Sequence, residues 1–133
     1  MKNYLGIDYG ISKIGLALSD SETKVCLPYK ILNEFEFWNS IQNIIEENNI
    51  DEVVLGIPKN LNNEETQQTQ ITMNFFEKLK NTINKKIHLE DERMTSKFAN
   101  EIKKNIGMKN LGAEDDSSAA LILDSFLKRE YGN

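Results

Sequence analysis

The strongest structural signal in this chain lies in Tyr4-Leu5-Gly6-Ile7-Asp8-Tyr9-Gly10 and in the segment Ile14-Gly15-Leu16-Ala17-Leu18-Ser19-Asp20 that follows it. Apolar and aromatic residues with glycine interruptions predict two strands joined by a tight connection. Asp8 does not fit this pattern, because a carboxylate buried in a hydrophobic strand is costly unless a metal ion or another group pairs with it. Alternatively, Asp8 lies at the strand end and accepts hydrogen bonds from the turn at Gly10. The flanking Gly6 and Gly10 favour a functional role, since glycine allows a ligand to approach the backbone closely.

Length, charge and cysteine content restrict the class of protein. The chain has 133 residues, enough for one domain with a hydrophobic core. No apolar run is long enough to cross a membrane and no cleavable leader is recognisable, while a single cysteine, Cys26, excludes internal disulfides and indicates a reducing compartment. We therefore expect a cytoplasmic protein. The net charge of −5 argues against tight nonspecific binding to nucleic acid, but the total hides a basic segment formed by Arg93, Lys97, Lys103, Lys104 and Lys109.

The rest of the chain alternates between short apolar runs and segments of helical periodicity. Residues 25–32 predict a third strand, and Pro28 makes it an edge strand or one with a bulge. Residues 52–58 predict a strand that is buried on both faces, and residues 87–93 predict a strand that ends in acids. Four helices are predicted, with apolar stripes formed by Phe35, Trp38, Ile41, Ile44 and Ile45; by Ile71, Phe75, Leu79 and Ile83; by Phe98, Ile102 and Ile106; and by Ala119, Ile122, Leu123 and Phe126. This order predicts an α/β fold with a five-stranded mixed sheet, three antiparallel strands followed by two parallel ones, and helices on both faces.

Few catalytic side chains other than acids are present. Because His88 and Cys26 are the only histidine and cysteine, a zinc site of nitrogen and sulfur ligands lacks donors. A Ser-His-Asp triad would need His88, which we expect to be a structural residue inside its strand. Gly15 is followed by Leu16 rather than by Lys-Ser or Lys-Thr, so the glycines here do not form a phosphate-binding P-loop.

The remaining candidates are carboxylates from three separate segments: Asp8, Asp91, Glu92, Asp115 and Asp116. Oxygen donors suit Mg²⁺ or Mn²⁺, and such ions activate water and stabilise the charge that develops during phosphate hydrolysis. Each acid also has a structural interpretation: Asp91 and Glu92 as solvated charges at a strand end, Asp115 or Asp116 as a helix N-cap. A metal site requires the three segments to converge, and the spacing in the sequence leaves both interpretations open.

Four motifs occur in the order of one known family: Gly6-Ile7-Asp8-Tyr9-Gly10 with Lys13-Ile14-Gly15-Leu16-Ala17-Leu18-Ser19-Asp20; Gly56-Ile57-Pro58-Lys59-Asn60; Asp91-Glu92-Arg93-Met94-Thr95-Ser96; and Asp115-Asp116-Ser117-Ser118-Ala119-Ala120-Leu121-Ile122-Leu123. In these motifs the chain resembles the YqgF/RuvX family of pre-16S rRNA nucleases, which are related to Holliday junction resolvases. The resemblance covers nearly the whole length and implies that residues 1–133 form a single nuclease domain of RNase H-like fold. Where the family usually has Lys-Arg, this chain has Ser12-Lys13, which keeps one charge but loses the two-pronged geometry of arginine.

The resemblance also implies roles for individual residues. Asp8, Glu92 and Asp115 would be the catalytic acids and would bind Mg²⁺ or Mn²⁺, with Asp91 and Asp116 as adjacent candidates. The substrate-binding residues would be Lys13, Asn60, Arg93, Thr95 and Ser96.

The function that the resemblance implies is hydrolysis of phosphodiester bonds by a metal-dependent nuclease in the cytoplasm. Its expected role in ribosome biogenesis is 5′-end processing of pre-16S ribosomal RNA, either free or in ribosomal particles, by a monomer or a dimer. Two rival functions are a Holliday junction resolvase-like endonuclease that cuts branched DNA, and a non-catalytic RNA-binding factor in ribosome assembly.

Overall fold

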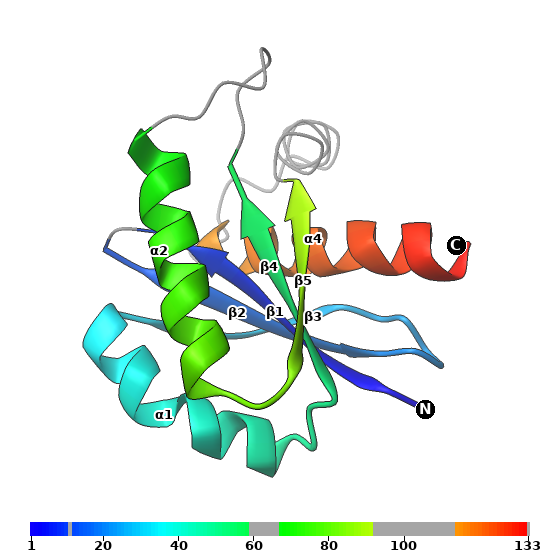
Figure 1. Cartoon of the computed structure of the whole chain (residues 1–133). Coiled ribbons are helices and arrows are strands. Elements are labelled where there is room, and N and C mark those ends of the chain that lie inside the picture. The colour runs from blue at the N-terminus through cyan, green and yellow to red at the C-terminus, as the bar shows by residue number, and fades with distance from the viewer. Residues whose placement is uncertain (11, 59–66, 92–113, 133) are drawn as a thin grey trace.

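The computed structural model of the chain describes residues 1–10, 12–58, 67–91 and 114–132, with the backbone alone at 114–117 (Figure 1). Its elements, labelled as in Figure 1, are β1 (Asn3–Tyr9), β2 (Ile14–Asp20), β3 (Leu27–Leu32), α1 (Glu34–Glu47), β4 (Glu52–Ile57), α2 (Gln67–Thr82), β5 (Lys86–Asp91) and α4 (Glu114–Tyr131). The helix predicted around Phe98 lies outside the described residues. Within the described ranges, no helix combines the length and the apolar character needed to cross a membrane.

The five strands form one mixed sheet with the order β3-β2-β1-β4-β5. Strands β1, β2 and β3 are antiparallel neighbours, whereas β4 runs parallel to both β1 and β5. The predicted five-stranded mixed sheet is therefore confirmed. The parallel strands β1, β4 and β5 also end at the same edge of the sheet, and this edge positions the candidate site.

Strand β3 lies at the edge of the sheet and its pairing with β2 is irregular. Leu16 pairs with Lys30 and Ala17 pairs with Pro28, so Tyr29 is an extra residue at a bulge. Pro28 predicts either an edge strand or a bulge, and β3 has both. The physical reason is that proline has no N–H to donate to a neighbouring strand.

Helices cover both faces of the sheet, as predicted. In Figure 1, α1 and α2 lie in front of the strands and α4 lies behind them. The front core is formed by Leu5, Ile7, Tyr9, Ile14, Leu16, Phe37, Ile41, Ile44, Ile45, Ile50, Val53, Leu55, Phe75, Leu79 and Ile83. The smaller core under α4 is formed by Tyr4, Ala17, Val54, Ala119, Ile122, Leu123, Phe126 and Leu127. Alternate residues of β1 and β4 belong to alternate cores, as the pleat of a strand requires.

The buried face of α1 differs from the predicted one. Phe37 is fully buried and Phe35 is 77% exposed, so the prediction that Phe35 belongs to the apolar stripe is wrong. Phe37 precedes Ile41 by four residues and Ile44 by seven, so these three side chains lie on one face of the helix. The helical spacing in the sequence is compatible with either Phe35 or Phe37 on the buried face. Trp38 lies at the border of the core, where its indole Nε1 donates to Glu34.

The other sequence predictions for this part of the chain agree with the structure. The stripe of α2 buries Phe75 and Leu79, and Ile83 is buried just after the helix. Cys26 packs against the core under α4, and burial raises the pKa of its thiol to about 11, as suits a small apolar residue rather than a nucleophile. His88 is structural: its Nε2 lies 2.7 Å from Oε1 of Glu52, and its ring packs against Phe126.

Candidate active site at the carboxyl end of β1

Asp8 lies at the carboxyl end of the central strand β1 and is half-buried. It pairs with Gly15 of β2 and follows Ile7, which pairs with Leu55 of β4. Its neighbours Ile7 and Tyr9 both belong to the front core. Since side chains alternate along a strand, the carboxylate of Asp8 faces the opposite side, which α4 covers.

Helix α4 runs antiparallel to β1, and its beginning approaches Asp8. The ring of Tyr4, at the start of the strand, packs against Phe126 in the second half of the helix. Two residues further along β1, the backbone at Gly6 contacts Ala119 and Leu123 instead. Two strand residues span about 7 Å, which corresponds to about four or five helix residues. The next inward position, Asp8, therefore lies level with the first turn of α4, in agreement with Figure 1, where the helix begins beside the tip of β1.

The two glycines that flank Asp8 accommodate the protein itself. At Gly6, an added Cβ would lie 3.0 Å from the carbonyl oxygen of Ala119, so the missing side chain lets α4 approach the sheet. At Gly10, the N–H donates to the carbonyl oxygen of Lys13 at 2.9 Å, and an added Cβ would lie 2.7 Å from that oxygen. The expectation that these glycines admit a ligand is therefore not met. The bond to Lys13 also gives the Gly10 N–H a partner other than Asp8. Because residue 11 of the turn lies outside the described residues, the alternative of Asp8 as a turn acceptor stays a prediction.

The acids at the end of β5 are divided between the two faces of the sheet. Glu90 bonds to Ser125 of α4, so it lies on the same face as Asp8. Asp91 is the next residue and pairs with Ile57, on the face of the front core. The structure therefore does not bring Asp91 together with Asp8.

The remaining predicted site residues are only partly described. Lys13 is exposed in the connection between β1 and β2, close along the chain to Asp8. The first turn of α4 contains Asp115 and Asp116, of which the backbone is described. Glu92, Asn60, Arg93, Thr95 and Ser96 lie outside the described residues. Among the residues whose side chains are described, no group of three or more His, Cys, Asp or Glu could hold a metal ion, so the convergence of three acids stays a prediction.

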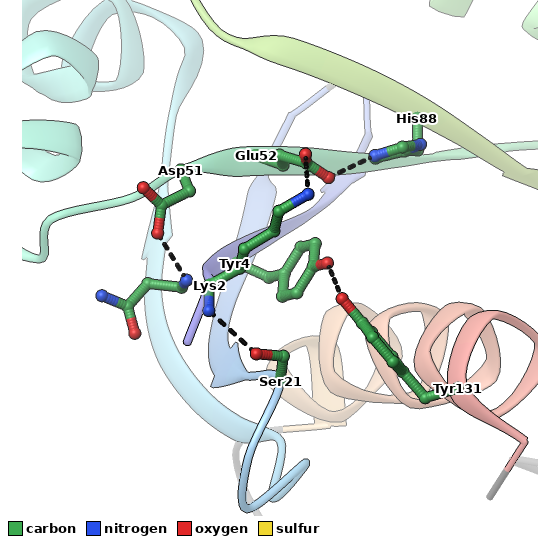
Figure 2. A network of polar contacts seen from close by, with 8 residues as sticks. Lys2, Tyr4, Ser21, Asp51, Glu52, His88 and Tyr131 are labelled. Carbon is green, nitrogen blue, oxygen red and sulfur yellow. Dashed lines mark hydrogen bonds and ion pairs between the residues drawn. The ribbon is translucent and has the colours of Figure 1, made fainter.

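The sequence interpretation missed a polar network under α4 (Figure 2). Glu52 accepts from Nζ of Lys2 at 2.9 Å and contacts His88, while the hydroxyl groups of Tyr4 and Tyr131 lie 2.5 Å apart. Burial acts to raise the pKa of Glu52, but the hydrogen bonds from Lys2 and His88 outweigh it and hold the pKa below its ordinary value. This network ties the N-terminus and α4 to the sheet at the end opposite Asp8, so it is structural.

The sequence interpretation also missed the contacts of the buried carboxylate of Glu90. It is 3% exposed, accepts a hydrogen bond from Ser125 Oγ at 2.8 Å, and lies 2.5 Å from Nη1 of Arg129. The alternation of β5 could have placed Glu90 on an inner face, but no pattern in the sequence identifies its partners, which lie 35 and 39 positions along the chain. Both partners belong to α4, so Glu90 joins β5 to this helix.

Comparisons with known proteins show the family of this chain. A family model described as "RuvX: Holliday junction resolvase" matches residues 2–129. Proteins of Rickettsia africae and Rickettsia conorii, both named "Putative pre-16S rRNA nuclease", are 36% identical to this chain over 129 residues, which cover 92% of the chain and 84% of each relative.

Solved structures with the same fold are Holliday junction resolvases. RuvC of T. thermophilus, in complex with a Holliday junction substrate, has a TM-score of 0.61 at 11% identity and covers 99% of this chain and 97% of that one. The fowlpox virus resolvase has a TM-score of 0.54 at 14% identity, with coverage of 96% and 99%. At such identities the likeness shows the fold alone, which is RNase H-like.

Proposed function

Because this chain belongs to the RuvX family of nucleases, we propose that it hydrolyses phosphodiester bonds in a divalent-metal-dependent reaction during 5′-end processing of pre-16S ribosomal RNA. The observation that carries the proposal is the position of Asp8. It is a half-buried carboxylate at the end of the central strand, on the face covered by the first turn of an acid-bearing helix. The proposed substrate would place the activity in the cytoplasm.

The proposed ligands of Mg²⁺ or Mn²⁺ are Asp8, Glu92 and Asp115. The donor set fits such an ion, since hard divalent cations prefer carboxylate oxygens. Asp91 is not among the proposed ligands, because it lies on the face opposite Asp8. Glu92 is proposed from its match to the family motif. Asp115 is favoured over Asp116 by its match to the family motif alone. When bound, the ion would lower the pKa of the attacking water and neutralise charge on the scissile phosphate.

The polar and basic residues near this edge are proposed to hold the RNA. Lys13 follows the strand that carries Asp8, and as an exposed, positively charged residue it suits a phosphate of the backbone. Asn60, Arg93, Thr95 and Ser96 are proposed to contribute further contacts on the strength of their motif positions. Contacts of this kind fix the position of the strand to be cut without reading its sequence.

The decisive experiment is cleavage of a labelled pre-16S RNA by the wild type and by Asp8→Asn, each with Mg²⁺, Mn²⁺ or EDTA. We expect metal-dependent cleavage by the wild type and a loss of at least about 100-fold in the variant, since even the loss of a ligand's supporting partner costs 10–100-fold. Circular dichroism should show an unchanged fold.

The matched control for Asp8→Asn is Asp20→Asn. It removes a carboxylate from the other end of the same hairpin, where Asp20 pairs in register with Asn3, and should leave cleavage intact. Full activity of Asp8→Asn would rule out Asp8 as an essential ligand.

A second candidate substrate is branched DNA, which is favoured by the description of the family model and by the junction bound to T. thermophilus RuvC. A four-way junction in the same assay distinguishes the two substrates. Resolution of a two-fold symmetric junction requires two active sites, so it also predicts a dimer in sedimentation. Metal-independent RNA binding without any cleavage would instead favour a ribosome-assembly factor.

A further inference from the structure

The carboxylate of Glu90 joins β5 to α4 at a place that the proposed chemistry does not use. Ser125 donates to one of its oxygens, and the guanidinium of Arg129 lies against the other, close enough for an ion pair but without the angle of a hydrogen bond. Ser125 and Arg129 are four residues apart, one turn of α4, so they hold the carboxylate from one face of the helix. We call Glu90, Ser125 and Arg129 the Glu90 clamp.

The Glu90 clamp is a poor source of net stability. Taking the Glu90 carboxylate out of water costs several kcal/mol. The side chain of Arg129 is 57% exposed, so water weakens the ion pair that offsets this cost. Charge-assisted contacts differ from apolar contacts in being directional. The main effect of the Glu90 clamp is therefore to fix the position of α4 relative to β5.

Besides the Glu90 clamp, a hydrogen bond between the hydroxyl groups of Tyr4 and Tyr131 holds α4 to the sheet, at the end of the helix far from Asp8. The helix face that packs against the strands is formed by Ala119, Ile122, Leu123, Phe126 and Leu127. Apolar burial depends on area and tolerates a small shift along the axis. The close approach at Gly6 limits the distance between helix and sheet, and the Glu90 clamp fixes the helix along its axis against β5.

The two segments that the Glu90 clamp joins also supply two of the proposed metal ligands. Glu90 is two residues before Glu92, and α4 carries Asp115 in its first turn. Metal–ligand distances tolerate deviations of about 0.2 Å, whereas a shift of the helix by one residue moves its side chains by about 1.5 Å. An error in the position of α4 would thus displace the proposed ligand Asp115 relative to Asp8.

We propose that the Glu90 clamp is a positioning device for the metal site, which sets α4 on the sheet so that the acid of its first turn meets Asp8 and the acid that follows β5. This inference rests on the proposed function. Glu90 itself acts through the helix and does not touch the ion.

The test replaces the clamp by apolar residues in the double variant Glu90→Leu/Arg129→Met. Because the variant removes a buried carboxylate whose ion-pair partner is largely exposed, we expect a thermal midpoint close to that of the wild type. The dissociation constant for Mn²⁺, measured by electron paramagnetic resonance or calorimetry, should nevertheless rise about tenfold. Saturating Mn²⁺ should restore most of the kcat, since the chemical groups are all present.

The matched control is Glu52→Gln. Glu52 is a half-buried carboxylate on the same face of the sheet, and its hydrogen bonds with Lys2 and His88 do not involve α4. We expect this variant to be less stable than the wild type and to bind Mn²⁺ with the same affinity. A merely structural role of Glu90 would give the reverse pattern for the clamp variant, namely lower stability and unchanged affinity.

The outcomes separate this inference from the function on which it rests. If Mn²⁺ binding to the wild type does not depend on Asp8, the proposed ligand set and the clamp inference both fail. If it depends on Asp8 and the clamp variant binds Mn²⁺ as tightly as the wild type, the clamp inference alone is wrong. Should the double variant not fold, Glu90→Gln decides in the same way, because it keeps the volume and the bond to Ser125 but loses the ion pair.

Discussion

Gly10 closes the hairpin that carries Asp8, and its lack of a side chain is required there. Its N–H donates to the carbonyl oxygen of Lys13, so the chain turns within a few residues and brings β2 back beside β1. The space for a Cβ is taken by the same oxygen. The position of Asp8 beside Gly15 thus depends on the backbone of Gly10, two residues further along the chain.

At the residue scale, Gly10→Ala should destabilise the protein. An added Cβ would lie 2.7 Å from the Lys13 oxygen, and relief of such a contact by backbone movement costs about 1–3 kcal/mol. Urea unfolding at pH 7 measures the loss. Ser12→Ala, an exposed change in the same hairpin, should stay within about 0.5 kcal/mol of the wild type. A Gly10→Ala variant as stable as the wild type would show that the hairpin can relax without cost.

At the element scale, the position of each helix and strand was less predictable than its existence. Both phases of α1 satisfy helical spacing, and the choice of Phe37 over Phe35 depends on the contact with Phe75 of α2. The capping box of Asn33 and Glu36 fixes where α1 begins. A local sequence pattern shows neither the contact of α1 with α2 nor the rotation of α1 about its axis that this contact selects.

The contacts of Glu52 between β4, β5 and the N-terminus predict a pH dependence of stability. The pKa of Glu52 is lower in the folded state than its ordinary value of about 4.3. Its stabilising effect is therefore fully present above the unfolded pKa and is lost as the pH falls through the folded pKa. The difference in unfolding free energy between the wild type and Glu52→Gln should shrink from pH 6 to pH 3 in urea titrations.

The matched control for the pH series is Glu47→Gln, on the exposed side of α1. It should change the unfolding free energy little at any of these pH values. A constant difference between the wild type and Glu52→Gln across the whole range would contradict the lowered pKa.

At the scale of the whole molecule, two hydrophobic cores on either face of the sheet build the fold from protein contacts alone. EDTA should therefore leave the circular dichroism spectrum and the thermal midpoint unchanged. A ligand that binds only the folded state stabilises it, by about 2.7 kcal/mol at 100 times its dissociation constant. Mn²⁺ should accordingly raise the midpoint of the wild type in scanning calorimetry.

The same measurement on Asp8→Asn gives the control for metal binding. Its midpoint should not respond to Mn²⁺, because the carboxylate on which the proposed site depends is gone. An equal response in both proteins would place Mn²⁺ binding elsewhere on the molecule.

The sequence by itself determined the five strands and their antiparallel-then-parallel order, and it singled out Asp8 as a candidate site residue. These features are local: alternation, helical spacing, a proline in an edge strand, and one acid among apolar residues in a motif shared with a family. Only the tertiary structure decided that Gly6 admits α4, that Asp91 faces away from Asp8, and that Glu90 pairs with Arg129. Each of these depends on which face of one element meets another distant in sequence, and the free energy of that packing is not encoded in any short segment.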